Sequence, residues 1–185
     1  MIKASLVSAL KSHIENQRYI EITFISLEDM KAETICCIPL SISGKLLLML
    51  VFIDFLPDGY RIMRLQDISK VDYDETCRYF DRIVKQEGAL QLIKKAPDIL
   101  IEDWKSTFAS LRDKGIIVII DIGKEGCIHI GEVVESTARE VRMRCFSPVG
   151  VWDDGEWHEL IKNITYVEFS THYTNTYTKY IYKIK

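Results

Sequence analysis

The sequence lacks the features that define several classes of protein. None of its apolar stretches reaches the roughly 18 to 20 residues that a membrane-spanning helix needs, and the longest of them have the length of strands. Charge of one sign is not in excess, since 24 Lys and Arg stand against 27 Asp and Glu, which leaves a formal net charge of −3. A strongly basic nucleic-acid-binding protein is therefore not indicated. A disordered chain is excluded too, because 48% of the residues are hydrophobic, and the composition is that of a soluble globular protein.

Sequence motifs for catalysis are missing as well. The chain contains no G-x-S-x-G, no P-loop and no G-x-G-x-x-G. Its four histidines, at positions 13, 129, 158 and 172, are scattered and lie in no nucleophile motif. We therefore expect no enzyme and no cofactor. Asp153, Asp154 and His158 are close enough in sequence to suggest a metal site, but a turn and solvent exposure explain both aspartates, so no metal is expected.

The cysteines and the N-terminal segment favour a cytoplasmic protein. The cysteine count is odd, two are adjacent and no C-x-x-C occurs, so neither a disulfide framework nor a zinc ribbon is indicated. Buried free thiols in a reducing compartment are expected. The apolar N-terminal segment is interrupted by Lys11 and His13 and has no cleavage site, so it is predicted to be an amphipathic helix rather than a signal peptide. The cysteines are Cys36, Cys37, Cys77, Cys127 and Cys145.

An internal similarity favours two units over one domain of average size, both of which a length of 185 residues allows. The dipeptides Asp58-Gly59 and Asp154-Gly155 lie 96 residues apart. At the same offset, residues 68–73 align with 164–169, and Ile20 and Ile22 align with Ile116 and Val118. We therefore divide the chain into a first half, residues 1–90, and a second half, residues 91–185.

Each half is predicted to consist of an amphipathic helix followed by five short strands. The fold class is accordingly mainly β with flanking helices (α+β), arranged as two tandem small five-stranded antiparallel barrels. The Asp-Gly dipeptides are predicted to form type I′ turns between the third and fourth strands, and the linker is placed near residues 87–98. The C-terminal tail has helical spacing in Tyr173, Tyr177, Tyr180, Ile181 and Ile184, but its threonines favour a strand, and we expect a helix. The expected helices cover 2–16, 74–86 and 98–113, and the expected strands cover 19–25, 33–41, 45–55, 60–65, 68–73, 115–122, 127–135, 140–146, 157–161 and 164–169.

Two resemblances to known proteins accompany this pattern. Residues 115–119, Gly126 and 130–134 resemble the first motif of Sm proteins, which implies an Sm-like small barrel, with 161–167 at the place of the second motif. The residues that contact uridine in that family are replaced by Ser136–Glu140 and by Lys162-Asn163, so the RNA-contacting residues do not carry over. Residues 58–74 are similar to uncharacterised bacterial proteins with D-G-Y…R-L-x-D-I-x-x-V-x-Y-D, which implies a bacterial source and no activity.

The segment from Leu46 to Phe52 is predicted to be an interface. A strand with one face in water alternates apolar and polar residues, whereas this one is apolar on both faces. Its cover can be a helix, the other half or a second chain. The candidate interface residues are Leu46, Leu48, Leu50 and Phe52.

A second candidate surface lies in the second half. Arg142 and Arg144 alternate with apolar residues along one strand, and Arg139 precedes them, so together they form an arginine stripe that suits phosphate or an acidic partner. Pairing with Glu132 or Glu140 across the sheet is the plainer interpretation. Trp152 and Trp157, with Tyr60 and Tyr166, lie near the expected turns and suit either cross-strand packing or the stacking of a ligand.

Two functions follow as hypotheses. The first is a non-enzymatic interaction module that self-associates or binds a protein partner. The alternative is an Sm-like RNA-binding protein that uses the arginine stripe. Nucleic acid is the weaker expectation for a partner, because acidic residues outnumber basic ones in both halves, and no membrane is expected.

Overall fold

The fold is a single antiparallel sheet with helices packed against it. The computed structural model describes residues 4–25, 31–123 and 128–181, and in these residues ten strands form one open sheet. No helix in the described residues is long and apolar enough to cross a membrane. The fold is mainly β with flanking helices, as the sequence predicts.

Both halves have the same order of elements: a helix, four strands, a short 3-10 turn, a fifth strand and a closing helix. The 3-10 turns, Leu65–Asp67 and Ile161–Asn163, lie 96 residues apart. The first half contains α1 (Ala4–Glu15), β1 (Ile20–Ile25), β2 (Ala32–Ile42), β3 (Leu46–Ile53), β4 (Leu56–Arg64), β5 (Ile68–Asp72) and α2 (Glu75–Gln86), and the short helix α3 (Ala89–Lys94) crosses the boundary between the halves. The second half contains α4 (Trp104–Asp113), β6 (Val118–Asp121), β7 (Ile128–Ser136), β8 (Glu140–Cys145), β9 (Trp157–Leu160), β10 (Tyr166–Phe169) and α5 (His172–Ile181).

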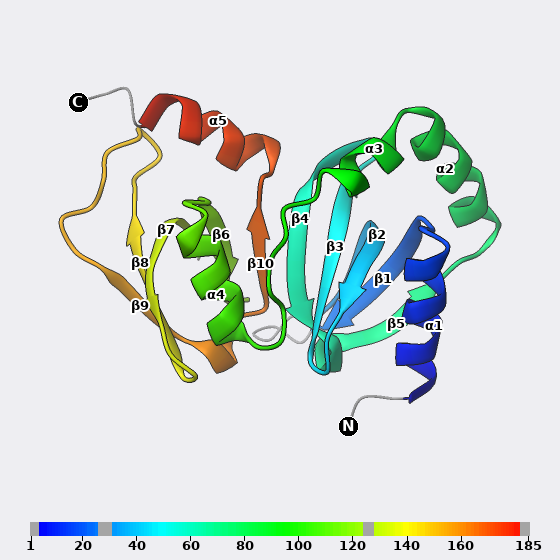
Figure 1. Cartoon of the computed structure of the whole chain (residues 1–185), viewed down its shortest axis with the longest axis horizontal. Helices are drawn as coiled ribbons and strands as arrows, with labels where there is room; N and C mark the ends of the chain where they lie inside the picture. Colours follow the sequence, from blue (N-terminus) through cyan, green and yellow to red (C-terminus); the bar gives the residue numbers. More distant parts are fainter. Residues whose placement is uncertain (1–3, 26–30, 124–127, 182–185) are drawn as a thin grey trace.

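The halves meet along one pair of strands. The strand order is β5-β1-β2-β3-β4-β10-β6-β7-β8-β9, so β4 of the first half pairs with β10 of the second. Figure 1 shows the two halves side by side, with β4 and β10 in the middle of the molecule. The expectation of two separate five-stranded barrels is therefore wrong. The sheet does not close, and its end strands are β5 and β9.

Several boundaries differ from the sequence-based expectation for local reasons. The turn between β3 and β4 lies at Asp54 and Phe55, and Asp54 has a positive φ of 55°. Asp58-Gly59 lies inside β4 instead, and of this pair only Gly59 has a positive φ, so the predicted type I′ turn is wrong. The helix expected over 98–113 begins only at Trp104, because the Asp103 side chain caps it by accepting from the Ser106 N–H.

Other expectations are confirmed or fall outside the described residues. The C-terminal helix is confirmed as α5, and the helix expected over 74–86 is confirmed as α2. The expected linker near 87–98 contains the short helix α3, which begins after Gly88, a residue with a φ of 96°. Ile2, Gly126, Cys127 and Ile184 lie outside the described residues.

Candidate interaction site

The apolar strand β3 lies in the interior of the chain. The candidate interface residues Leu46, Leu48, Leu50 and Phe52 are between 1% and 5% exposed and belong to a core cluster that includes Val118 and Val167 of the second half. The opposite face of β3 carries Leu47, Met49 and Val51, which pack in a second cluster with Leu10 of α1 and Ile20 of β1. Helices and the second half of the same chain therefore cover both faces, and these side chains are not on the surface for a partner.

The junction between β4 and β10 is held by a partly buried ion pair. Arg61 donates from Nε and Nη2 to Oε1 of Glu168, at 2.9 and 2.7 Å. The two side chains are 12% and 18% exposed. The guanidinium also lies over the Tyr166 ring, 3.6 Å from its centroid, and burial raises the pKa of that tyrosine well above its usual range. Next to this pair, Tyr60 stacks on Phe169, with 5.4 Å between the ring centroids.

The same junction has a close approach of backbones at its upper end in Figure 1. The Asp58 carboxylate accepts from the N–H of His172, the first residue of α5, at 2.7 Å. The neighbouring Gly59 leaves no room for a side chain, because a Cβ there would lie 2.5 Å from the Thr171 nitrogen and 2.7 Å from the Phe169 oxygen. Gly59 is therefore required by the contact between the halves as well as by its positive φ of 77°.

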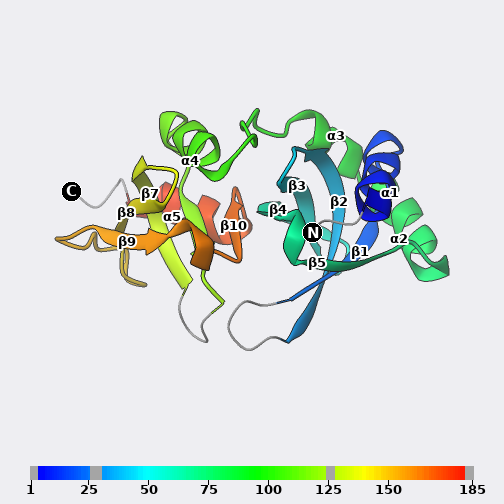
Figure 2. The same ribbon diagram turned by 90° about the horizontal axis from the view of Figure 1, so that it is seen from below.

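The two strands at the free edges of the sheet, β5 and β9, correspond to the junction strands β10 and β4 when the halves are aligned at the 96-residue offset. Subtracting 96 from β10 (166–169) gives residues 70–73, which overlap β5, and adding 96 to β4 (56–64) gives 152–160, which contain β9. In the described part of the chain, β5 pairs only with β1 and β9 only with β8. Figure 2 shows β9 at the end of the molecule opposite α2, which follows β5 in the chain. Each half thus uses one of its two end strands at the junction and leaves the other free.

The three arginines of the stripe have different partners. Arg142 pairs with Glu135 and, at 2.8 Å, with Glu156, while the Arg144 guanidinium lies over the Trp152 ring, 4.6 Å from its centroid. Arg139 lines a different region, a pocket beside the junction.

The two tryptophans singled out as candidate ligand contacts, Trp152 and Trp157, also have different partners. Trp152 packs edge-on against Phe146, and Trp157 stacks on His129 with 3.9 Å between the ring centroids. Burial lowers the pKa of His129, which favours its neutral form. Each indole therefore contacts another ring within its own half.

A pair of adjoining pockets lies between the two halves, with volumes of about 280 and 420 Å³. Sequence reasoning missed this site, because its residues come from four separate turns and from the start of α4. The buried Trp104 Nε1 and Arg64 Nη2 on its walls have no acceptor among the described residues. Five cationic side chains and one acidic side chain line the two pockets: Lys45, Arg64, Lys105, Arg139, Lys162 and Asp103.

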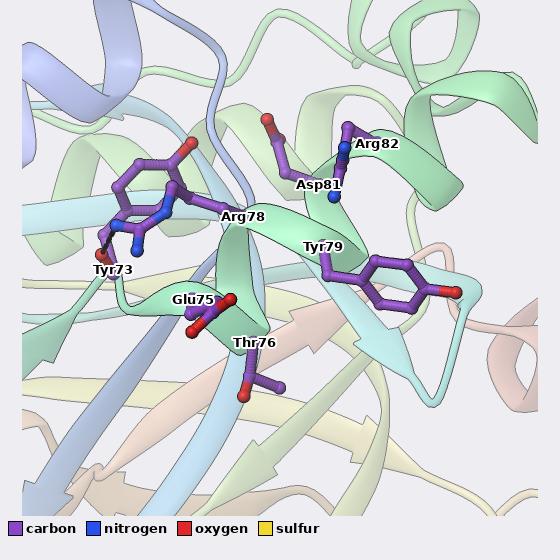
Figure 3. A pocket seen from close by; sticks show the side chains of 7 residues that line it. All are labelled: Tyr73, Glu75, Thr76, Arg78, Tyr79, Asp81 and Arg82. Atoms are coloured by element: carbon purple, nitrogen blue, oxygen red, sulfur yellow. Dashed lines mark hydrogen bonds between the residues drawn. The ribbon is translucent and has the colours of Figure 1, made fainter.

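A larger open groove of about 780 Å³ runs along the first turns of α2 and includes Tyr73, the residue that follows β5 (Figure 3). Arg78 donates from Nη1 to the Tyr73 carbonyl at 3.4 Å. Asp81 is buried and accepts from the Tyr19 N–H at 2.8 Å and from Lys85 at 2.9 Å. The groove is lined by Tyr73, Glu75, Thr76, Arg78, Tyr79, Asp81 and Arg82.

Neither the side-chain geometry nor the comparisons with known proteins point to a reaction. The described residues contain no group of three or more His, Cys, Asp or Glu side chains placed to hold a metal ion. The described cysteines, Cys36, Cys37, Cys77 and Cys145, are free thiols. No protein-family model, no curated protein and no solved structure matches this chain, so nothing in these comparisons indicates an enzyme.

Proposed function

We propose that this protein is a non-enzymatic interaction module that self-associates through the two free edges of its sheet. One observation carries the proposal. The strands that join the halves, β4 and β10, have counterparts 96 residues away in β9 and β5, and these counterparts end the sheet. The chain therefore already contains one example of the contact that a second copy would make.

The chemistry of strand edges supports this proposal. An edge strand presents a row of unpaired N–H and C=O groups, which is a template for another strand. Because β5 and β9 are different surfaces, pairing one with the other is a head-to-tail contact, which builds a ring if the rotation closes and a filament if it does not. A strand from a different protein is the competing occupant of either edge.

The similarity between the two halves leads to a second part of the proposal, which concerns their origin. We infer that they are a degenerate tandem repeat of Sm-like descent in a bacterial, cytoplasmic protein. The shared order of elements and the 96-residue spacing of the two 3-10 turns support the repeat, and the sequence resemblance supports the descent.

The test is the mass of the full chain in solution. We expect size-exclusion chromatography with light scattering to give multiples of 21.5 kDa that grow with protein concentration. A mass of one chain at every concentration would overturn the proposal. An assembly that forms only with a protein from the same cell would favour the competing occupant.

The junction pocket supports RNA binding as a second candidate function. Its five cations and two buried unpaired donors suit a ligand with anionic oxygens. Of the arginine stripe, only Arg139 contributes to it, because Arg142 and Arg144 are engaged elsewhere.

Binding of poly-uridine and mixed RNA at low and physiological salt distinguishes the two candidates. The variants are the triple change Arg139→Ala, Arg142→Ala and Arg144→Ala, and the double change Lys105→Ala and Lys162→Ala at the pocket. Micromolar, salt-sensitive binding that the pocket variant loses would favour RNA as the ligand. No binding at low salt would remove this candidate.

A further inference from the structure

We infer that residues 153–156 of one copy, which we name the acidic loop, dock against the end of β5 and the start of α2 of a second copy, in the register in which β4 already meets β10. This inference rests on the proposed self-association and adds its register and its contacts. The acidic loop contains Asp153, Asp154, Gly155 and Glu156.

The register follows from the junction inside the chain. There, Met63 lies opposite Tyr166, and Ile62 lies opposite Val167, in antiparallel pairing. Adding 96 to the β4 residues and subtracting 96 from the β10 residues places Glu159 opposite Lys70 and His158 opposite Val71. Residues preceding β9, including the acidic loop, then run past Tyr73 towards α2.

One directly opposed pair in this register carries opposite charges. Lys70 and Glu159 have opposite signs, and directly opposed residues of antiparallel strands point to the same face of a sheet. The Lys70 side chain is 67% exposed and contacts only Asp72 of its own strand, at 2.8 Å, as an ion pair among the described residues. It is therefore accessible to a carboxylate from a second copy.

Gly155 supplies an independent observation. Its φ is not positive, and a Cβ built on it meets no atom within 4 Å, so the single chain gives no structural reason for a glycine there. Its counterpart Gly59 is required, because the backbone between β10 and α5 lies 2.5 to 2.7 Å from where its Cβ would be. A second copy seated in the same way would bring the backbone after β5 equally close to Gly155. The docking therefore explains a glycine that the isolated chain does not.

The start of α2 presents both signs of charge to the aspartates of the loop. Asp58 accepts from the first N–H of α5 at the internal junction, so its counterpart Asp154 is placed at the start of α2. A helix N-terminus attracts a carboxylate. Two carboxylates already lie there, because Asp74 accepts from the Cys77 N–H at 2.8 Å and Glu75 is the first residue of α2. Arg78 and Arg82 on the following turns supply positive charge (Figure 3).

The first test is the change Gly155→Val in the full chain, measured by light scattering and by thermal unfolding. The free chain has room for the new side chain, so the melting temperature is expected to stay close to that of the wild type. The dissociation constant for assembly is expected to rise by at least about tenfold, because the side chain would meet the backbone of the second copy. Gly44→Val is the matched control, since Gly44 also has open space and no positive φ but lies in the turn between β2 and β3.

The second test is a charge exchange. Lys70→Glu and Glu159→Lys each place like charges opposite one another and are expected to weaken assembly by about tenfold. The double variant carries both changes in one chain and restores opposite charges at every contact, so its assembly is expected to return towards that of the wild type.

The outcomes separate this inference from the proposed function. A wild-type chain that is monomeric at every concentration overturns both. A chain that assembles equally well with Gly155→Val and with each charge variant overturns the register and the docking of the acidic loop, while self-association stands. Loss of assembly in the single charge variants without recovery in the double variant also overturns the register.

Discussion

Replacing Arg61 with alanine tests how strongly the two halves hold together. The Arg61 and Glu168 side chains are 12% and 18% exposed, so the contribution of this ion pair to stability lies between that of a fully buried pair and that of an exposed pair. Breaking a buried pair costs about 3 to 5 kcal/mol, and an exposed pair contributes about 0.2 to 1 kcal/mol. Stacking on Tyr166 adds roughly 0.5 to 2 kcal/mol, which Arg61→Ala also removes. We expect Arg61→Ala to lower the free energy of unfolding by about 2 to 3 kcal/mol.

The assay is thermal and urea unfolding against a control pair of the same geometry. Arg112 donates from Nε and Nη2 to one oxygen of Asp113, at 3.0 and 2.8 Å, but these side chains are 43% and 65% exposed. Arg112→Ala is therefore expected to cost less than about 0.5 kcal/mol. For a chain of this length, the loss at Arg61 corresponds to a fall of about 5 to 10 °C in the melting temperature. Equal costs for the two variants would refute the argument that burial at the junction gives this pair its strength.

Three further predictions follow from burial and close packing. Burial and the nearby Arg18 lower the pKa of His13, so the folded state favours the neutral imidazole. The stabilisation that this gives the fold is present above the unfolded-state pKa near 6.5 and declines as the pH falls below it. His13→Gln should therefore reduce the fall in melting temperature between about pH 7.5 and 5.5. Burial raises the pKa of the Cys37 thiol well above its usual range, so in the folded chain a thiol reagent should label the half-buried Cys36 first, and equal labelling by mass spectrometry would contradict this. Gly131→Ala places a Cβ 2.0 Å from the Arg144 carbonyl oxygen and should cost about 1 to 3 kcal/mol in urea unfolding, and an unchanged midpoint would contradict it.

Local patterns predicted most of the elements, because each depends on residues that are close in sequence. The apolar spacing of α1 and α2 and the C-terminal helix could be found in this way, since a helix buries one stripe of side chains. The Asp-Gly pairs misled, because Asp58-Gly59 is shaped by a contact with Ser170 and Thr171 that is distant in sequence. A glycine required by close approach and a glycine required by a hairpin turn look alike in a sequence.

The candidate site could be predicted only in part, for the same reason. The apolar character of β3 correctly required cover on both faces, but nothing local says that the cover is the same chain. Pairing of β4 with β10 involves only four residue pairs, and their composition does not select a partner. The 96-residue offset was the one sequence feature that pointed to β5 and β9 as possible pairing edges, because it relates each of these end strands to a strand of the junction.

The long loop that the junction closes has a consequence for synthesis of the chain. Arg61 and Glu168 are 107 residues apart, so the edge of β4 has no partner until the segment up to Glu168 has been made. At elongation rates of about 5 to 20 residues per second, that edge waits roughly 5 to 20 s beside the strongly apolar strand β3. On a polysome, β10 of a neighbouring nascent chain competes for the same edge, and the exchange would give domain-swapped dimers. The stability of the finished junction is therefore a separate property from the yield of correctly folded chains. The stability depends on Arg61 and Glu168, whereas the yield depends on how soon β10 is synthesised and pairs with β4.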